Sequence, residues 1–440
     1  MKGGTFKGGL SNGVFSVNEI DTPIEELLPP PKATIPLKQH NGKECKATVK
    51  KGEEVKVGQV IAESVSPEQA SIHATVSGKV IEVTKRFPDI RGRYVSAVTI
   101  ESDGKDEWVA PPETKANYPN KSSEKLLSLI EKAGVVDFGI DAVPVSAKLG
   151  LIKDKSVNTI IVSGIDIEPF LSVRKRLILE RVQDIAEGIE ILKKVSNVPS
   201  VYFAIEDKDA EMKERASSAI SPVAELAVLK AKFPQAMDRP LVKAVLGKEV
   251  PSPNGIPEDI GVSIFGAETI LAILDAVKEE RPVIDKVITV TGAVNSPKNL
   301  KVRIGTPIKD VIEHCGGING EVAKVIIGGP LMGLAQYTTE IPVSKETSGV
   351  FVQLESDLAT ISRQKCINCK WCIDVCPMNL LPNIISQYCE VDLFEKAEDY
   401  GLSYCIECSC CAYVCPAKIP LLHWIKYGKS QLEKLEKEEK

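Results

Sequence analysis

The chain contains 440 residues, of which 43% are hydrophobic and 26% are charged, and its net charge is −5. This length exceeds what one hydrophobic core can organise, so we expect about three or four domains. The weak negative charge excludes a general attraction for nucleic acid or for an anionic membrane surface. No stretch reaches roughly 18 consecutive apolar residues, the length of a transmembrane helix. The polar N-terminus, MKGGTFKGGL, is not that of a secretory signal peptide.

Residues 1–31 are rich first in Gly and then in Pro, which predicts an extended arm. In residues 32–105, short runs of Val, Ile and Thr are separated by Lys-Gly and Ser-Gly turns, which predicts an all-β domain. Its segments KKGEEVKVGQVIAE and IHATVSGKVIEV resemble the two halves of a biotinyl/lipoyl-type barrel-sandwich hybrid. Carrier versions of that barrel have a lysine on the hairpin between the halves. Here the hairpin, residues 64–70, has no lysine, so we expect a structural barrel.

Residues 121–280 follow a polar, Pro-containing linker and alternate apolar strands with amphipathic helices. The segments NTIIVSG and PSVYFAIED are typical of buried strands, and residues 174–195 have the apolar spacing of a helix. We also predict a helix over residues 217–233. This alternation predicts an α/β domain with a βαβ core.

Residues 283–335 give a strand, an Asn-Ser-Pro turn, a strand, a helix, a Gly-Gly turn and a strand. That order resembles the soluble-ligand-binding β-grasp (SLBB) module. We expect residues 336–355 to be a linker. In residues 356–440, the segments between the cysteines are expected to be helical.

Two runs of cysteines in that last region share the spacing C-x2-C-x2-C-x3-C followed by Pro. This is the bacterial ferredoxin signature of two [4Fe–4S] clusters, in which the fourth cysteine of each run ligates the other cluster. Zinc usually takes two C-x2-C pairs for one ion, and disulfides do not fit a chain without secretory features. We therefore assign cluster one to Cys366, Cys369, Cys372 and Cys415, and cluster two to Cys405, Cys408, Cys411 and Cys376.

The predicted fold class is therefore multidomain α+β. It combines an all-β barrel-sandwich hybrid, an α/β domain, a β-grasp (SLBB) module and an α-helical double [4Fe–4S] ferredoxin domain. Cysteines used for clusters indicate a reducing compartment, so we expect a cytoplasmic protein. The remaining cysteines are expected to pack or to form hydrogen bonds; they are Cys45, Cys315, Cys389 and Cys410.

The order of these parts resembles that of the RnfC family of the Rnf electron-transport complex, and the likeness runs nearly from end to end. The segments TFKGG, IPLKQH and GGPLMG look like signatures of that family, as do both cysteine runs. The resemblance implies that the α/β domain is similar to the flavin- and NADH-binding subunit of respiratory complex I. Such a domain binds FMN, oxidises NADH and passes electrons to the two clusters. Other members serve soluble systems, including a proline-reductase-associated electron-transfer protein.

The flavin loop of that family reads approximately G-x-G-G-A-x-F-P-T-x-x-K, and the chain departs from it. Gly139 and Lys148 match, whereas Ile140 stands for a glycine and Asp141 for the alanine. A β-branched side chain blocks the close approach of backbone N–H groups to a phosphate. A carboxylate about 5 Å from the FMN phosphate would cost roughly 3 kcal/mol per unit of charge at an effective dielectric constant of 20.

Three further stretches of the family's nucleotide site are also changed. Glu168 and Pro169 keep part of N-x-A-E-C-E-P-Y, residues 233–238 have lost the glycine of Y-P-Q-G-x-E, and only Thr269 remains of N-V-x-T. Because each change removes a specific contact, we expect binding of FMN and NADH to be relaxed or absent. By the resemblance, the residual FMN and NADH site consists of Gly139, Lys148 and Glu168.

Our leading hypothesis is an iron–sulfur protein that relays electrons through two clusters to or from a partner oxidoreductase. By the resemblance, its partners are protein subunits of an Rnf complex or a soluble reductase such as proline reductase. It would be free in the cytoplasm or held at the cytoplasmic face of a membrane by partner subunits, without inserting into the membrane itself. One alternative is a complete FMN-dependent NADH:acceptor oxidoreductase subunit of a membrane Rnf complex, with NADH as a further partner. The other is a binding or assembly module whose clusters are mainly structural.

Overall fold

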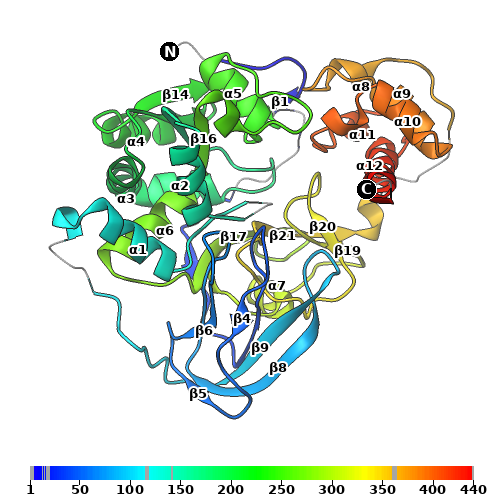
Figure 1. Cartoon of the computed structure of the whole chain (residues 1–440). Coiled ribbons are helices and arrows are strands. Elements are labelled where there is room, and N and C mark those ends of the chain that lie inside the picture. Colours follow the sequence, from blue (N-terminus) through cyan, green and yellow to red (C-terminus); the bar gives the residue numbers. More distant parts are fainter. Residues whose placement is uncertain are drawn as a thin grey trace.

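A computed structural model describes residues 4–11, 13, 15, 20–113, 118–139, 142–358 and 364–438. Figure 1 shows the barrel strands at the bottom, the α/β domain above them at the upper left, and the helices of the cysteine-rich region grouped at the upper right. Among the described residues, no helix combines the length and the apolar character needed to cross a membrane.

The barrel consists of a four-stranded and a three-stranded antiparallel sheet, in the orders β3-β9-β8-β5 and β4-β6-β7. Ile35, Ile61 and Ile100 extend from both sheets into its core and are fully buried. Each side chain buried in this way contributes roughly 1.5–3 kcal/mol. The strands are β3 (Lys32–Pro36), β4 (Lys46–Ala47), β5 (Glu54–Val55), β6 (Val60–Glu63), β7 (Ile72–His73), β8 (Gly78–Pro88) and β9 (Tyr94–Ser102).

The α/β domain is built on a four-stranded parallel sheet in the order β14-β13-β12-β16. Every residue of β12 and β16 is buried, which explains why these strands read as continuous apolar runs. The strands are β12 (Thr159–Ser163), β13 (Ser200–Glu206), β14 (Glu225–Leu229) and β16 (Val262–Gly266). The helices are α1 (Ser123–Lys132), α2 (Val145–Asp154), α3 (Val173–Ser196), α4 (Ala210–Ile220), α5 (Asp238–Leu246) and α6 (Ala267–Lys278).

The helix that we predicted over residues 217–233 is wrong. Helix α4 ends at Ile220, and the chain then forms β14 and the short strand β15 (Lys232–Phe233). Pro222 follows the end of α4 and cannot extend it, because proline lacks the N–H group that a helix interior requires. Burial within β14 alternates, so its apolar residues follow the period of a strand and not that of a helix.

The β-grasp module forms a six-stranded sheet in the order β2-β18-β17-β21-β19-β20. The N-terminal arm supplies the edge strand β2, which pairs with β18. We expected residues 336–355 to be a linker, but they contain β21, which lies between β17 and β19. The elements are β2 (Glu25–Glu26), β17 (Asp285–Gly292), β18 (Lys298–Arg303), α7 (Ile308–His314), β19 (Val322–Ile327), β20 (Leu334–Gln336) and β21 (Gly349–Leu354).

The cysteine-rich region is helical, as the sequence predicted. Its two longest helices pack through Ile385, Cys389 and Ile425, which are all buried. A Cβ atom at Gly428 would lie 2.3 Å from Cys389 Sγ, so Cys389 fills the space between these helices. The helices are α8 (Trp371–Asp374), α9 (Pro382–Glu390), α10 (Phe394–Asp399), α11 (Cys410–Tyr413) and α12 (Leu421–Glu438).

A buried lysine joins the barrel, the α/β domain and the β-grasp module. Lys345 is 1% exposed, and its Nζ donates hydrogen bonds to the carbonyl oxygens of Ser71 at 3.2 Å and Gly134 at 2.6 Å. Its backbone N–H donates to Gln39 Oε1 at 3.0 Å. Burial lowers the pKa of Lys345 to about 8. These hydrogen bonds thus connect the β-grasp module to two segments of the barrel and to the α/β domain.

Candidate functional site

The two cysteine runs have the same backbone conformation. Asn368 and Lys370 in the first run have φ values of 53° and 66°, and Glu407 and Ser409 in the second have 57° and 64°. Such left-handed residues turn the chain sharply between successive cysteines. In each run a short helix, α8 or α11, begins one residue before the third cysteine. The spacing therefore produces two equivalent loops that wrap around a centre.

One group of thiols crosses between the runs. Burial raises the pKa of Cys372, and the neighbouring thiols of Cys366, Cys369 and Cys415 raise it further by charge repulsion. Cys415, the fourth cysteine of the second run, also belongs to one buried side-chain cluster with Cys372, so it lies beside the first loop. This is the set that we assigned to cluster one.

The second group is its counterpart. Burial raises the pKa of Cys405 to about 12, and the thiols of Cys408 and Cys376 add to the rise. Burial also raises the pKa of Cys411, and the thiols of Cys405, Cys408 and Cys376, followed by that of Cys372, add to the rise. Cys376, from the first run, therefore lies within the second loop. The structure brings together the four cysteines that we assigned to cluster two.

These surroundings fit an iron–sulfur cluster. Pocket-lining side chains of Leu380, Ile385 and Leu422 surround the second group of thiols, and burial in an apolar shell is one of the ways a protein tunes a cluster. The backbone N–H groups of Leu380 and Glu407 each donate to a cysteine sulfur at 3.4 Å. In the described part of the chain, no three His, Cys, Asp or Glu side chains converge to hold a single metal ion. A [4Fe–4S] cluster does not require such convergence, because each thiolate binds a different iron.

The two groups differ in their exposure. In the first loop Cys369 is exposed, and beside it Ile367 and Trp371 are 64% and 55% exposed. In the second loop Cys408 and Cys411 are buried. The first group therefore reaches the surface at Cys369, although its Cys372 and Cys415 are buried, and the second group is the more enclosed of the two.

The N-terminal arm lies against the first run of cysteines. Its strand β1 (Leu10–Ser11) pairs with β15 of the α/β domain. The N–H group of Gly9 donates to Val375 O at 2.8 Å. Gly8 has a φ of +72°, and a Cβ atom there would lie 2.6 Å from Cys376 O. The arm thus connects the α/β domain to the loop that carries Cys376.

Glu168, which we placed in the residual nucleotide site, contacts the β-grasp module instead. Its carboxylate is 3% exposed and accepts hydrogen bonds from the N–H groups of Gly329 at 3.0 Å and Leu331 at 2.8 Å. Burial raises the pKa of Glu168, and these N–H groups oppose the rise. The hydroxyl of Ser409, in the second cysteine run, donates to Leu331 O. One buried carboxylate therefore holds the loop on which the second run rests.

A cavity of ≈390 Å³ separates the α/β domain from the second cysteine run. Gly139 and Lys148 line it, and so does Ile406, which follows Cys405. A Cβ atom at Gly139 would meet no atom within 4 Å. The structure therefore places two of the three predicted nucleotide-site residues at this cavity and Glu168 outside its lining. Ile140 and Asp141 lie outside the described residues.

The sequence analysis missed Asp137, which also lines this cavity. Its carboxylate accepts hydrogen bonds from Lys148 Nζ at 2.5 Å, from the N–H of Gly266 at 3.0 Å and from Thr269 Oγ1 at 2.8 Å. Burial would lower the pKa of Lys148, but Asp137 and other carboxylates outweigh it, and the pKa is raised. The sequence did contain a signal for this residue. When Lys148 is aligned with the last position of the flavin-loop pattern, Asp137 falls on its first position, where the family has glycine.

The other cations at the cavity are also engaged. Arg174 forms two hydrogen bonds with the carboxylate of Glu268, at 2.7 and 2.9 Å. Arg239 donates to the carbonyl oxygens of Val250 at 2.7 Å and Pro253 at 2.8 Å. Each cation that lines the cavity, within the described ranges, thus already has protein acceptors.

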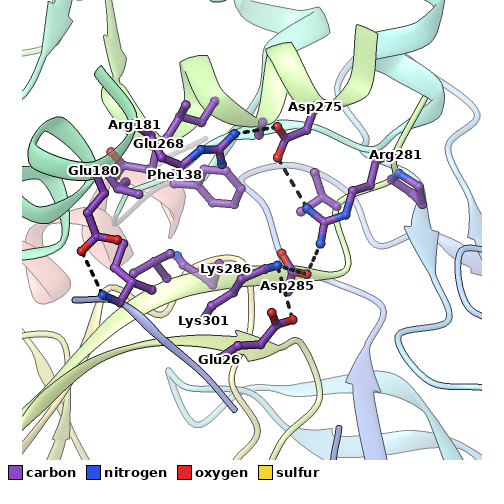
Figure 2. Close-up of a pocket in the computed structure, with 17 residues that line it drawn as sticks. Glu26, Phe138, Glu180, Arg181, Glu268, Asp275, Arg281, Asp285, Lys286 and Lys301 are labelled. Atoms are coloured by element: carbon purple, nitrogen blue, oxygen red, sulfur yellow. Dashed lines mark hydrogen bonds and ion pairs between the residues drawn. The ribbon is translucent and has the colours of Figure 1, made fainter. Parts of the chain in front are cut away.

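A second cavity, of ≈300 Å³, shares Phe138 with the first. Figure 2 shows that it is ringed by paired charges, among them Arg181 with Asp275 at 3.2 Å. Lys286 lies 4.8 Å from the centre of the Phe138 ring and donates to Lys345 O at 2.8 Å. Burial lowers the pKa of Lys286 to about 8. The cavity is a charge-compensated junction between α3, α6 and β17.

Comparison with known protein families matches the chain in four successive segments. Residues 4–105 match the RnfC barrel sandwich hybrid domain, and residues 130–275 match the Nuo51 FMN-binding domain. Residues 287–335 match the SLBB domain, and residues 358–416 match a 4Fe-4S dicluster domain. The predicted combination of domains is therefore confirmed.

The chain is also similar to whole proteins. The C subunit of a proton-translocating ferredoxin:NAD(+) oxidoreductase complex from Clostridium ljungdahlii is 37% identical over 430 residues, which cover 97% of this chain and 94% of that relative. The C subunit of a Na(+)-translocating ferredoxin:NAD(+) oxidoreductase complex from Acetobacterium woodii is 33% identical over 401 residues, 90% of each chain. The chain belongs to the RnfC family. A solved NAD+-reducing [NiFe]-hydrogenase in the H2-reduced state shares the fold, with a TM-score of 0.52 and 12% identity over 72% of this chain and 63% of that one.

Membership of the RnfC family settles the cofactor class of the cysteine runs. The dicluster match confirms two [4Fe–4S] clusters as the cofactors. The division of the eight cysteines between the clusters stays a prediction.

The match to an FMN-binding domain raises the question of whether the ≈390 Å³ cavity could hold FMN. The residues that line this cavity do not fit FMN. The cavity has room for a flat ring, but the cations among its described lining residues already donate to protein acceptors. Asp137 accepts the hydrogen bonds that a phosphate would need.

The ligand crossover can be tested with pairs of variants. We expect Cys376→Ser to lose about half of the bound iron and to give the same EPR spectrum as Cys408→Ser, because both would lack a ligand of cluster two. Cys415→Ser should instead match Cys369→Ser. The control Cys389→Ala removes a packed thiol and should keep all the iron. A Cys376→Ser spectrum that matches Cys369→Ser would contradict the crossover.

The role of Glu168 is tested by hydrogen exchange. In Glu168→Ala the N–H groups of Gly329 and Leu331 lose their acceptor, at a cost of roughly 1–3 kcal/mol for each buried group left unpaired. We expect faster amide exchange in residues 328–333, measured by mass spectrometry. The control Glu321→Ala changes an exposed carboxylate of the same module. Equal exchange in the two variants would show that Glu168 does not hold this loop.

Proposed function

We propose that this RnfC homologue relays electrons between protein partners through its two clusters. The observation that carries the proposal is that Cys376 lines one pocket with cysteines of the second run, and that Cys415 packs in one buried cluster with Cys372. Exchange of ligands between the loops keeps two clusters close together, which is what rapid transfer of single electrons requires. The apolar surroundings and the N–H···S contacts are the features by which a protein sets a cluster's potential.

The difference in exposure suggests a direction for the path. Cluster two would be enclosed beside the ≈390 Å³ cavity, with Ile406 between them. The Cys369 side of cluster one would lie at the surface near Ile367 and Trp371. A protein partner would therefore exchange electrons at cluster one. The named relatives are subunits of ferredoxin:NAD(+) oxidoreductase complexes, so the partners we propose are other subunits of an Rnf-type complex.

A second candidate is a complete NADH:acceptor oxidoreductase subunit that contains FMN. It is favoured by the FMN-binding-domain match and by a cavity next to the second cysteine run. The filled hydrogen bonds of Asp137 oppose it. A soluble partner such as proline reductase is a further candidate for the acceptor.

An EPR-monitored redox titration of the anaerobically purified chain tests the relay. We expect both clusters to be reduced and reoxidised reversibly, within the range of about −700 to +450 mV known for such clusters. Their spectra should broaden when both are reduced, because neighbouring paramagnets interact. Clusters that cannot be reduced in this range would instead support a binding or assembly module with structural clusters.

A further inference from the structure

Three hydrogen-bond donors from two separate parts of the chain converge on one carboxylate at the cavity. They are the ammonium group of Lys148 on α2, the N–H group of Gly266 before α6, and the hydroxyl of Thr269 in the first turn of α6. The acceptor is Asp137, at the end of the short strand β10 (Val136–Asp137). The arrangement depends on tertiary structure, because Asp137 is more than a hundred residues from Gly266.

These donors have the chemistry of a phosphate site. A helix N-terminus offers unpaired N–H groups and a positive end of the helix dipole, and a lysine adds a full charge. Helix α6 has 12 residues, and its N-cap Gly266 supplies no side chain of its own to accept a hydrogen bond. Asp137, from elsewhere in the chain, accepts hydrogen bonds at this helix end from the N–H group of Gly266 and the hydroxyl of Thr269. It thereby takes the place of an external anion.

The carboxylate of Asp137 balances the charge of the Lys148 ammonium group. The ammonium of Lys148 is largely enclosed, donates also to Ile264 O, and lies 4.6 Å from the centre of the Phe265 ring. A buried cation needs a nearby anion, because burial alone disfavours its charged form. With Asp137 present this requirement is met within the protein. With Asp137 removed, Lys148, Gly266 and Thr269 would each lose this acceptor, and an anion from solution could take its place.

We infer that Asp137 acts as a built-in substitute for phosphate and makes the cavity reject phosphate monoesters such as FMN. The inference rests on the proposed function, since it explains why the clusters would work without a resident flavin. The room at Gly139 and the apolar lining by Phe138 and Met332 still admit a flat ring. The selection therefore acts on the phosphate and not on the ring. Asp137 is a specificity-determining residue of this cavity.

FMN and riboflavin test this directly, because they differ only in the phosphate. Flavin fluorescence would be titrated under anaerobic conditions with the full cluster-containing chain. We expect the wild-type chain to bind FMN no more tightly than riboflavin. In Asp137→Gly, and in Asp137→Ser as a second small replacement, we expect FMN to bind about 10-fold or more tightly than riboflavin, because the phosphate can now reach Lys148 and Gly266.

The matched control is Asp238→Asn, which removes another carboxylate of the cavity lining and should behave as the wild type. A wild-type chain that prefers FMN by 10-fold or more would overturn the inference by itself, whether or not the variants fold. Folded Asp137 variants without a preference for FMN would overturn it too, as would an equal gain in Asp238→Asn. The EPR signals of the clusters, recorded on the same samples, report on the electron relay independently of flavin binding.

Discussion

The buried carboxylate of Glu168 is the contact on which the position of the second cysteine run depends. Glu168 belongs to the α/β domain, and its carboxylate accepts hydrogen bonds from two N–H groups of the loop in residues 328–333. These bonds fix Leu331, whose carbonyl oxygen accepts a hydrogen bond from the hydroxyl of Ser409. Three domains meet in this short path. Because an unpaired buried N–H group costs free energy, the loop has one favoured position, and the second cysteine run is set against it.

The first cysteine run is placed by a different contact. The arm pairs with β15 and donates from Gly9 to Val375, next to Cys376. Cys376 therefore lies where the second loop can enclose it. The two runs also differ in exposure, since Cys369 and Trp371 of the first run are exposed, whereas Cys408 and Cys411 of the second are buried. A cluster with an exposed edge can exchange electrons with a partner protein.

Local pattern predicted most of the architecture. The cysteine spacing indicated the two loops, because the turns between the cysteines are built from adjacent residues, and alternating Val and Ile indicated the barrel strands. Contacts between distant segments were not predictable in this way. We predicted one helix over residues 217–233, but the strand β14 forms there through pairing with β13, a contact between distant segments. Strand β21 likewise owes its place to β17 and β19.

The same limit applies to the candidate site. Glu168 matched a nucleotide-binding signature, but its partners lie about 160 residues further along the chain, in the β-grasp module. Asp137 escaped notice because its meaning depends on Gly266 and Thr269, which only the fold brings near. The sequence nevertheless indicated the correct region. Four altered stretches of one nucleotide site pointed to a cavity whose cations the structure shows bound to protein acceptors.

The most direct test of a relay that uses clusters without flavin is a count of iron and flavin on one anaerobic sample of the full chain. The sample's visible spectrum would be recorded before and after addition of NADH. Such a relay predicts about eight irons per chain, as two [4Fe–4S] clusters require, with no flavin and no rapid bleaching by NADH. One FMN per chain with rapid NADH-dependent bleaching of the clusters would contradict it.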